Sequence, residues 1–360
     1  MASKTETCVE ELPAVPADVT AQWLESKLGH RIKSVSLSLT RSIFGTASKL
    51  FFTIDYADEV ADPNSRPTHI CVKGVFDPAM AKSQPWTLDL AQREAEFFEK
   101  LAPLIKNMGY PRGWWGGKSD KQGIAIMSDL VYEGCMFPPQ VASYPLEKVL
   151  DGAAQIAALH ARFWGQSQED HPWITNDYDA CAKFIIEPWD TVVREPGRPK
   201  LPAYLLDGTR VKKALSKYFA ERNPKFRTLV HGDAHLGNIY FTAEGRTCFL
   251  DWSAFHFASC FHDLVYFVTT TQTVEARRAH EMEILDHYLA TLHRMGGPKL
   301  DLSDEELMVE YKRAFMNHSV WFTCGYDLHP KERVDAFTKR ALAAWVDHKV
   351  IEVVEAYSKS

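Results

Sequence analysis

Apolar and polar residues alternate in the N-terminal part of the chain, and apolar residues recur at helical spacing in the rest. Three segments, 32–40, 48–56 and 68–76, alternate in character and are rich in β-branched and aromatic residues, which predicts three strands. The short apolar run IAIMSDL, residues 124–130, predicts a buried strand. The polar, glycine-containing stretch before it, residues 113–123, predicts a loop.

Helical periodicity dominates after Leu130. It predicts helices over four segments, 146–165, 273–296, 304–323 and 331–357. In the N-terminal part, the same pattern predicts a helix over 88–105, and another over 16–29 that begins near Asp18 and ends at Gly29. A β-rich part followed by a helix-rich part indicates an α+β fold with two lobes. We expect an N-lobe over 1–130 and a C-lobe over 131–360, since Gly and Pro residues follow Leu130 in EGCMFPPQ.

Composition narrows the classes of function. The 360 residues include 46% hydrophobic and 24% charged residues, which is typical of a soluble globular protein. The net charge of −6, with Lys and Arg scattered, argues against nucleic acid as a partner. Neither a secretory signal nor an apolar run near the ~18 residues of a membrane span is present in the sequence. Seven cysteines without a C-x-x-C pair indicate free thiols, so we expect a cytoplasmic protein that does not act on membranes.

The segment LVHGDAHLGNIYF, residues 229–241, contains the strongest candidate chemistry and is followed by CFLDW. Two apolar runs around TAEGRT predict a β-hairpin, which would bring Asp251 beside Asn238. An Asp-x4-Asn spacing with a later Asp matches the catalytic loop and metal-binding Asp of kinases. Phosphoryl transfer needs a carboxylate that accepts the hydroxyl proton, together with oxygen ligands for Mg²⁺. We therefore predict Asp233 as the base, Asn238 and Asp251 as Mg²⁺ ligands, and ATP as the donor.

Two other interpretations of this segment stay open. His231, Asp233 and His235 alternate, so on a strand they would share a face and could ligate the zinc of a hydrolase, with His256 or His262 as a further ligand. This zinc interpretation leaves the amide and the later carboxylate unexplained. A purely structural interpretation makes His231 and Asp233 a buried, hydrogen-bonded turn. Four polar residues at a set spacing favour the kinase interpretation over both.

A lysine and a glutamate in the N-terminal part form the second candidate group. Lys73 lies in the middle of the third predicted strand, flanked by apolar residues. At about 100° per residue, Glu94 falls on the apolar face of its predicted helix, whereas Glu96 and Glu99 point away. An unpaired carboxylate on a core-facing stripe is costly, so we predict an ion pair between Glu94 and Lys73. Kinases use such a pair to hold the α- and β-phosphates.

Two further segments are candidates for nucleotide contacts. RSIFGTAS, residues 41–48, stands where a phosphate-covering loop belongs, but Gly45 is its only glycine and an ordinary hairpin turn explains it as well. Its hydroxyl and N–H groups could meet a phosphate. Backbone groups near Ser128 and Leu130 could face the adenine as a hinge, although a plain buried strand is equally compatible with this segment.

With these residues in place, the chain resembles the aminoglycoside phosphotransferase and choline kinase-like superfamily, which has a protein-kinase-like fold, and in particular its ecdysteroid-kinase-like branch. The resemblance runs from about residue 15 to the C-terminus. VHGDAHLGNIYF and FLDW resemble the H-G-D-x-H-x-x-N and D-[WF] motifs, with support from CVK, REAEFF, IMSDL, AAQIAALHARFW and FHDLVYFV. The resemblance implies the same roles for Asp233, Asn238, Asp251, Lys73 and Glu94.

The resemblance also implies that Asp263 braces the loop after the metal site, that His231 fixes the catalytic loop, and that His160 is a core histidine. Three departures stand out: a glycine-poor phosphate loop, Ser128 in place of an acidic hinge residue, and no glycine in SAFHFASCFH.

The implied function is a small-molecule kinase that transfers the γ-phosphate of ATP to a hydroxyl group of a metabolite or natural product. The alternative is a non-catalytic kinase-like protein that binds a nucleotide or another ligand. C-terminal aromatic and acidic residues predict an aromatic, weakly acidic acceptor pocket suited to a hydrophobic alcohol. These residues are Glu187, Trp189, Trp321, Phe322, Tyr326, Asp327, Trp345 and His348.

Overall fold

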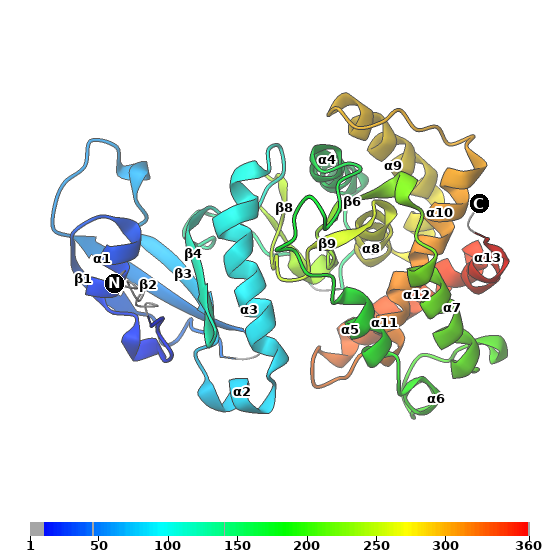
Figure 1. Cartoon of the computed structure of the whole chain (residues 1–360), viewed down its shortest axis with the longest axis horizontal. Helices are drawn as coiled ribbons and strands as arrows, with labels where there is room; N and C mark the ends of the chain where they lie inside the picture. Colours follow the sequence, from blue (N-terminus) through cyan, green and yellow to red (C-terminus); the bar gives the residue numbers. More distant parts are fainter. Residues whose placement is uncertain (1–10, 45–46, 140, 359–360) are drawn as a thin grey trace, which may run out of the picture. The chain divides into compact units, whose positions relative to one another are not determined.

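The computed structural model describes residues 11–44, 47–139 and 141–358, and the chain divides into two compact units (Figure 1). Unit 1 contains Met1–Ile105, Tyr110–Met136 and Asp251–Ser253. Unit 2 contains Lys106–Gly109, Phe137–Leu250 and Ala254–Ser360. Unit 1 is built on a sheet and unit 2 mostly on helices, so the α+β fold class predicted from the sequence is confirmed.

Unit 1 is built on a five-stranded, fully antiparallel sheet in the order β1-β2-β3-β5-β4 (Figure 1). Its strands are β1 (Ile32–Leu37), β2 (Ser48–Tyr56), β3 (His69–Gly74), β4 (Gly113–Ser119) and β5 (Gln122–Ser128). The four strands predicted from alternation and apolar runs are confirmed as β1, β2, β3 and β5.

The predicted loop over 113–123 is wrong, because most of this segment forms β4 and the turn into β5. Its glycines have a different purpose, which is close packing against the helix α3 (Trp86–Glu96). A Cβ on Gly116 would lie 2.3 Å from the carbonyl oxygen of Ala95, and one on Gly123 would lie 2.3 Å from the backbone of Ala91. A glycine within a strand can mark such a close approach of another backbone.

The first helix, α1 (Ala21–Leu28), is shorter than predicted. It begins after Thr20, whose hydroxyl accepts a hydrogen bond from the amide of Trp23 (3.1 Å), so the start predicted near Asp18 is wrong. Asp18 instead accepts hydrogen bonds from the amides of Ala14 and Val15 across a short 3₁₀ turn. The predicted end is confirmed, since Gly29 adopts a φ of 70° that favours glycine.

The predicted helix over 88–105 changes its winding along its length. The α-helical part, α3, continues as a π-helical turn over Phe97–Leu101 and a 3₁₀ turn over Ala102–Leu104. Single π-helical turns of this kind are frequent at functional sites. A short helix, α2 (Pro78–Ser83), precedes α3, which packs against β4 and β5.

Unit 2 is mostly helical (Figure 1). The helix α8 (Phe261–Thr271) is buried at every residue, and α4, α10 and α12 contact it. Because α8 is buried at every residue, including its few polar ones, it has no solvent-facing polar stripe, and the sequence pattern did not reveal it. The helices of unit 2 are α4 (Leu146–Arg162), α5 (Tyr178–Ile185), α6 (Trp189–Val192), α7 (Gly208–Ala220), α8, α9 (Val274–Arg294), α10 (Glu305–Ala314), α11 (Ser319–Thr323), α12 (Lys331–His348) and α13 (Val350–Ala356).

The four helical segments predicted for this part are confirmed, two of them in pieces. The segment 304–323 forms α10, a 3₁₀ turn over Phe315–His318, and α11. The segment 331–357 is divided between α12 and α13 at Lys349, whose φ of 49° interrupts the helix.

Two small sheets in unit 2 frame the polar segment that the sequence singles out. The strand β6 (Arg227–Val230) pairs with β9 (His256–Ser259), and β7 (Ile239–Phe241) pairs with β8 (Thr247–Phe249) as an antiparallel hairpin. The predicted hairpin is therefore confirmed. Since β6 ends at Val230 and β7 begins at Ile239, the residues between them form a loop fixed at both ends.

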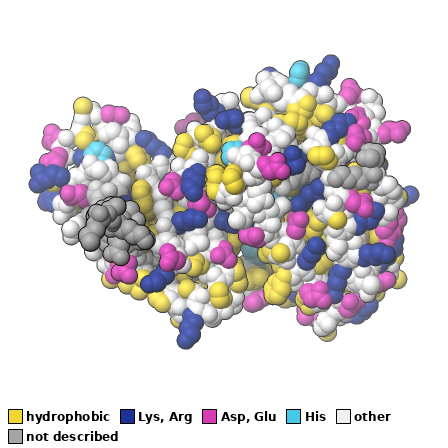
Figure 2. All heavy atoms as spheres, viewed as in Figure 1, with side chains coloured by type: hydrophobic (Ala, Val, Ile, Leu, Met, Phe, Trp, Pro, Cys, Tyr) yellow, Lys and Arg dark blue, Asp and Glu magenta, His cyan; other side chains and the backbone are white. Residues whose placement is uncertain are grey.

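Charged side chains of both signs are interspersed over the face drawn in Figure 2. No helix among residues 11–44, 47–139 and 141–358 is long and apolar enough to cross a membrane.

Candidate active site

The loop between β6 and β7 is held from below by a buried carboxylate. Asp263, in the first turn of α8, accepts hydrogen bonds from the amides of His231 (2.6 Å) and Gly232 (2.9 Å). Burial opposes the charge of Asp263, but hydrogen bonding by His160, 3.2 Å away, and nearby imidazoles hold its pKa below the usual value. Gly232 has a φ of 84°, and a Cβ there would lie 2.2 Å from the carbonyl oxygen of Ala254. Only glycine fits this turn.

The histidines of the loop are occupied by hydrogen bonds within unit 2. The Nδ1 of His231 accepts a hydrogen bond from the amide of Asp233 (3.2 Å), and its Nε2 donates to the carbonyl oxygen of Leu250 (2.9 Å). The Nδ1 of His235 accepts a hydrogen bond from the amide of Gly237 (2.8 Å). Zinc needs a free lone pair on each ligating imidazole.

These bonds argue against the zinc interpretation, since neither ring nitrogen of His231 is left for a metal. Moreover, residues 231–235 do not form the strand that this interpretation assumed. Within the part of the chain that the structure describes, no group of three or more His, Cys, Asp or Glu side chains is arranged to hold a metal ion.

Asp233 and Asn238 are joined by their side chains, as the Asp-x4-Asn spacing requires. The Nδ2 of Asn238 donates to the backbone oxygen of Asp233 (3.0 Å) and to its Oδ2 (2.9 Å). The carboxylate of Asp233 is 38% exposed, so a reactant can reach it. With both amide hydrogens directed at Asp233, the Oδ1 of Asn238 is left as an acceptor. An amide oxygen of this kind is a suitable ligand for a hard cation.

The hairpin also fixes the residue before Asp251. The amide of Leu250 donates to the carbonyl oxygen of Asn238 (2.8 Å) within unit 2. Asp251 follows directly in the chain, with a φ of 58° that is uncommon for a residue with a side chain. A backbone held in this region usually marks a functional position.

Asp251 belongs to unit 1, where its partly exposed carboxylate completes a cluster around the buried amine of Lys73. The Nζ of Lys73 lies 2.6 Å from Oε2 of Glu94 and 3.1 Å from Oδ2 of Asp251. Lys73 and Glu94 are 6% and 4% exposed. The ion pair predicted from the helical face is therefore present, and the structure adds a third member that the sequence did not reveal.

Each charge in the Lys73 cluster shifts the pKa of the others. Burial opposes the charge of Lys73, but Asp251 and Glu94 hold the pKa of the amine above its usual value. Burial likewise opposes the charge of Asp251, but Lys73, Lys49 and the hydroxyl of Ser253 (2.8 Å) hold its pKa below the usual range. Burial raises the pKa of Glu94 against the opposing effect of Lys73. The cluster thus keeps one cation between two carboxylates.

An aromatic stack anchors the residues around Asp251 in unit 1. The ring of Trp252 lies parallel to that of Phe97, with centroids 4.2 Å apart, and Trp252 is fully buried. Phe97 is the first residue of the π-helical turn.

The prediction that Glu96 points away from the core is wrong. Glu96 is 6% exposed, and its Oε1 lies 2.7 Å from the Nζ of Lys100 and 2.9 Å from that of Lys118. Lys118 belongs to β4, the strand that the sequence misassigned as loop, so the sequence contained no sign of this partner. Glu99 is exposed, as predicted.

The segments predicted to contact the nucleotide are only partly described. Gly45 lies outside the described residues. Ser128 is used internally, because its amide donates to the carbonyl oxygen of Arg112 (2.9 Å) and its hydroxyl accepts from Nε1 of Trp114 (3.1 Å). No hydrogen bond among the described residues uses the amide of Leu130, which leaves a backbone donor at this position.

Sequence reasoning missed the residue between Ser128 and Leu130. Asp129 is 2% exposed and binds the guanidinium of Arg41 through both carboxylate oxygens, at 2.6 and 2.8 Å. This bidentate pair ties the segment after β1 to the end of β5 and raises the pKa of Arg41. The two residues are 88 positions apart, so only the fold reveals the contact.

The predicted aromatic acceptor pocket is wrong for its largest members. Trp189, Phe322 and Trp345 pack against one another and are at most 2% exposed, so they form core and no pocket wall. Glu187 pairs with Lys212 at 3.2 Å.

Other residues of unit 2 surround the carboxylate of Asp233. The Nε2 of His235 lies 3.6 Å from Oδ2 of Asp233. Tyr178 and Tyr266 have pKa values raised well above normal, first by burial and then by the charge of Asp233. The helix α12 contributes Arg333, which the sequence analysis did not single out.

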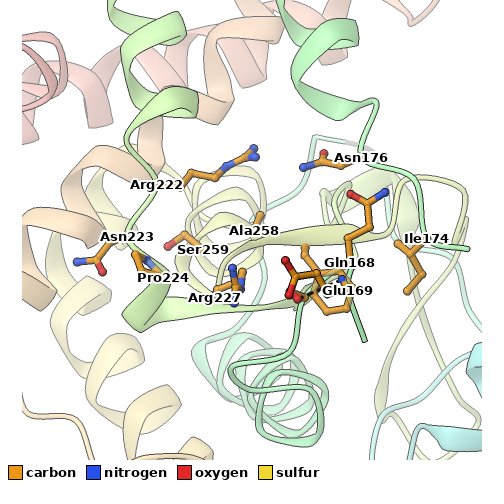
Figure 3. Close-up of a pocket in the computed structure, with 12 residues that line it drawn as sticks. Gln168, Glu169, Ile174, Asn176, Arg222, Asn223, Pro224, Arg227, Ala258 and Ser259 are labelled. Atoms are coloured by element: carbon orange, nitrogen blue, oxygen red, sulfur yellow. Dashed lines mark hydrogen bonds between the residues drawn. The ribbon is translucent and has the colours of Figure 1, made fainter. Parts of the chain in front are cut away.

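A separate cavity of about 450 Å³ opens in unit 2 at the other end of β6 (Figure 3). Arg222, Arg227 and Asn176 project around it, and Ser259 lines it from β9. Arg227 and Ser259 pair at the end of the β6–β9 ladder remote from His231. This cavity is therefore distinct from the surroundings of Asp233.

Comparison with known proteins supports the resemblance seen in the sequence. Residues 163–296 match the model of the ecdysteroid kinase-like family, and this range includes the loop between β6 and β7, Asp251 and Asp263. Among curated proteins, no sequence matches the chain significantly.

Solved structures similar to the chain include aminoglycoside phosphotransferases and choline and ethanolamine kinases. Spectinomycin phosphotransferase APH(9)-Ia, solved with ADP and spectinomycin, is 13% identical over 93% of this chain and 96% of its own, with a TM-score of 0.46. Choline kinase LicA from Streptococcus pneumoniae is 14% identical over 91% and 99%, with a TM-score of 0.48. Aminoglycoside 2'-phosphotransferase-IIIa, solved with GDP, is 12% identical over 91% and 97%, with a TM-score of 0.49.

Proposed function

We propose that the protein is a small-molecule kinase that transfers the γ-phosphate of ATP to a hydroxyl group of a metabolite or natural product. The observation that carries this proposal is the joined pair of Asp233 and Asn238. An accessible carboxylate is oriented by an amide whose own oxygen remains available, in a loop braced by Asp263. The match of residues 163–296 to the ecdysteroid kinase-like family model supports the same class of reaction.

The donor set fits Mg²⁺. Hard divalent cations take oxygen ligands, and Asn238 and Asp251 offer an amide oxygen and a carboxylate held below its usual pKa. In the proposed enzyme these two residues hold the ion, which neutralises charge on the phosphates when bound.

The chain's own residues have separate tasks in the proposed reaction. Lys73 binds the α- and β-phosphates, and Glu94 keeps its Nζ in place. Residues 1–130, with the loop containing Gly45 and the backbone amide of Leu130, bind the nucleotide, while residues 131–360 bind the acceptor.

Asp233 accepts the proton of the acceptor hydroxyl as its oxygen bonds to the γ-phosphorus and the bond to the leaving ADP breaks. The carboxylate is held in orientation by the amide of Asn238. General-base assistance of this kind contributes about 10²- to 10⁴-fold in rate.

A screen of small alcohols with ATP and Mg²⁺ tests the proposal. We expect ADP formation that depends on the alcohol, and phosphorus NMR should identify a phosphate monoester. The Asp233→Asn variant is the matched control, since it keeps volume and hydrogen bonding but loses the base. Nucleotide binding without any alcohol-dependent turnover would favour a non-catalytic kinase-like binding protein instead.

A further inference from the structure

Arg333 is a buried cation whose charge the fold offsets only in part. It lies in the first turn of α12 and is 9% exposed, yet no ion pair among the described residues involves it. Its Nη1 donates to the Nδ1 of His329 (3.0 Å), while its Nε is buried and has no hydrogen-bond partner in the described part of the chain. Burying a guanidinium in this way lowers the stability of the fold, so we expect Arg333 to have a function.

The guanidinium lies beside the catalytic loop. A Cβ on Gly237 would lie 3.1 Å from Nη1 of Arg333 and 2.6 Å from Cε1 of His235. The Nε2 of His235 is in turn 3.6 Å from Oδ2 of Asp233. The missing side chain of Gly237 therefore leaves the space in which Arg333 approaches the loop.

None of the groups that face Arg333 neutralises it. Burial lowers the pKa of His329 to about 4, with a further contribution from Arg333, so this imidazole is uncharged at neutral pH. Burial raises the pKa of the Cys324 thiol to about 11, so the thiol is uncharged as well. The charge of Asp233 partly offsets the lowering of the Arg333 pKa by burial, but the two side chains do not form an ion pair.

One nitrogen of the guanidinium remains as a donor that a ligand can reach. His329 occupies Nη1 and Nε is closed off from solvent, whereas Nη2 is neither hydrogen-bonded nor fully buried within the described residues. A carboxylate accepts a charge-assisted hydrogen bond from such a donor.

We propose that Arg333 binds a carboxylate of the acceptor while a hydroxyl of the same molecule reaches Asp233, so that the substrates are small hydroxy acids. This inference rests on the proposed kinase function and names its substrate class. It replaces the weakly acidic pocket expected from the sequence, since a cation beside the proposed base favours an acidic acceptor over a neutral alcohol.

Matched pairs of acceptors provide the test. A panel of aliphatic and aromatic hydroxy acids, each with its primary carboxamide, is assayed with ATP and Mg²⁺ on the wild-type protein and on Arg333→Gln and Arg333→Lys. Lys339→Gln is the control, because it removes a positive charge from the same helix at an exposed position.

We expect the wild-type protein to prefer the acids over their amides. Arg333→Gln should raise KM for the acid about 10- to 100-fold, the range expected for charge-assisted hydrogen bonds, with KM for ATP and turnover of the amide unchanged. Arg333→Lys should recover part of the preference, and Lys339→Gln all of it. Melting temperatures near that of the wild type establish that the variants fold.

Three results would overturn the inference. Equal losses on acid and amide would make Arg333 a positioning residue for Asp233, and a raised KM for ATP would place it on the phosphates. The third is the absence of any preference for acids in the wild-type protein. If the wild type phosphorylates no alcohol, the proposed function fails on its own. Calorimetric titration with the same hydroxy acids then decides the site: binding that is lost in Arg333→Gln supports it, and the absence of binding contradicts it.

Discussion

Lys73 in unit 1 and Arg333 in unit 2 are both buried cations, but only one of them is neutralised by the fold. Lys73 lies within 3.1 Å of two carboxylates, whereas Arg333 has an uncharged imidazole as its partner. The desolvation of Lys73 is offset by its neighbours, so its cluster is stable without a ligand. Arg333 retains an unsatisfied cost, which an anionic ligand can relieve. The difference separates a cation that the fold itself neutralises from one that we propose to bind the acceptor.

The largest effect is expected at the carboxylate of Asp233, the proposed base. Asp233→Asn should lower kcat by about 10²- to 10⁴-fold, because the base is lost while the volume and the hydrogen bond from Asn238 are kept. Nucleotide affinity, measured by calorimetry, should stay nearly unchanged. A variant that retains most of its turnover would remove Asp233 from the mechanism.

Replacing each cation by methionine sharpens the comparison. Lys73→Met leaves Glu94 buried without its cation and Asp251, which is partly exposed, without its neighbour, so the free energy of unfolding should fall by about 3–5 kcal/mol, together with loss of transfer. Arg333→Met removes a charge that has no ion-pair partner, so its cost should be clearly smaller. Chemical denaturation measures both changes, and equal destabilisation by the two substitutions would break the comparison.

Acid should destabilise unit 2 through its buried neutral histidines. Burial lowers the pKa of His262 from 6.5 to about 4, so the unfolded chain binds a proton in this range and the folded chain does not. The contribution of neutral His262 to the free energy of unfolding is fully present above pH 6.5 and is lost as the pH falls towards 4. The loss amounts to about 3 kcal/mol.

His262→Gln can keep the hydrogen bond to the carbonyl oxygen of Gly232 and cannot titrate. The difference in unfolding free energy between pH 7 and pH 4 should therefore shrink by that amount in the variant. An unchanged difference would show that His262 is not buried in neutral form.

The smallest effects distinguish three glutamates, two in α3 and one in the π-helical turn that follows it. Glu94→Gln should weaken transfer by releasing Lys73, and in a double-mutant cycle with Lys73→Met the two losses in kcat/KM for nucleotide should not add. Glu96→Gln breaks contacts with Lys100 and Lys118, so it should lower stability while leaving the coupling to Lys73 intact. Glu99→Gln, at an exposed position, should change stability by less than about 0.5 kcal/mol. Strict additivity of the changes at Glu94 and Lys73 would rule out the functional pair.

The sequence was informative where a contact follows from local periodicity. The hairpin of β7 and β8 follows from two apolar runs around a polar turn, and the ion pair of Glu94 with Lys73 follows from the helical face of α3. Both inferences start from a pattern that can be seen in one short stretch of sequence. The strand β4 was missed because its glycines, which signal a loop, serve the close approach of α3.

Contacts between distant segments could not be predicted. The carboxylate of Asp129 meets Arg41 across 88 positions, and Arg333 reaches the loop between β6 and β7 from α12. Neither residue belongs to a periodic pattern or a motif that would have indicated its partner. The aromatic residues of the C-terminal segments do belong to a pattern, but it is the pattern of a helical core. The sequence analysis wrongly assigned them to a pocket.

Transfer of isotopically labelled phosphate is the most direct test of the proposed kinase function. The purified protein is incubated with Mg²⁺, a hydroxy acid from the panel and ATP whose γ-phosphate contains only oxygen-18, and the products are analysed by mass spectrometry. We predict an acceptor phosphate with three labelled oxygens and one unlabelled bridging oxygen, formed together with ADP, and absent with Asp233→Asn. Labelled inorganic phosphate as the only product, or the same yield from Asp233→Asn, would contradict phosphoryl transfer by this site.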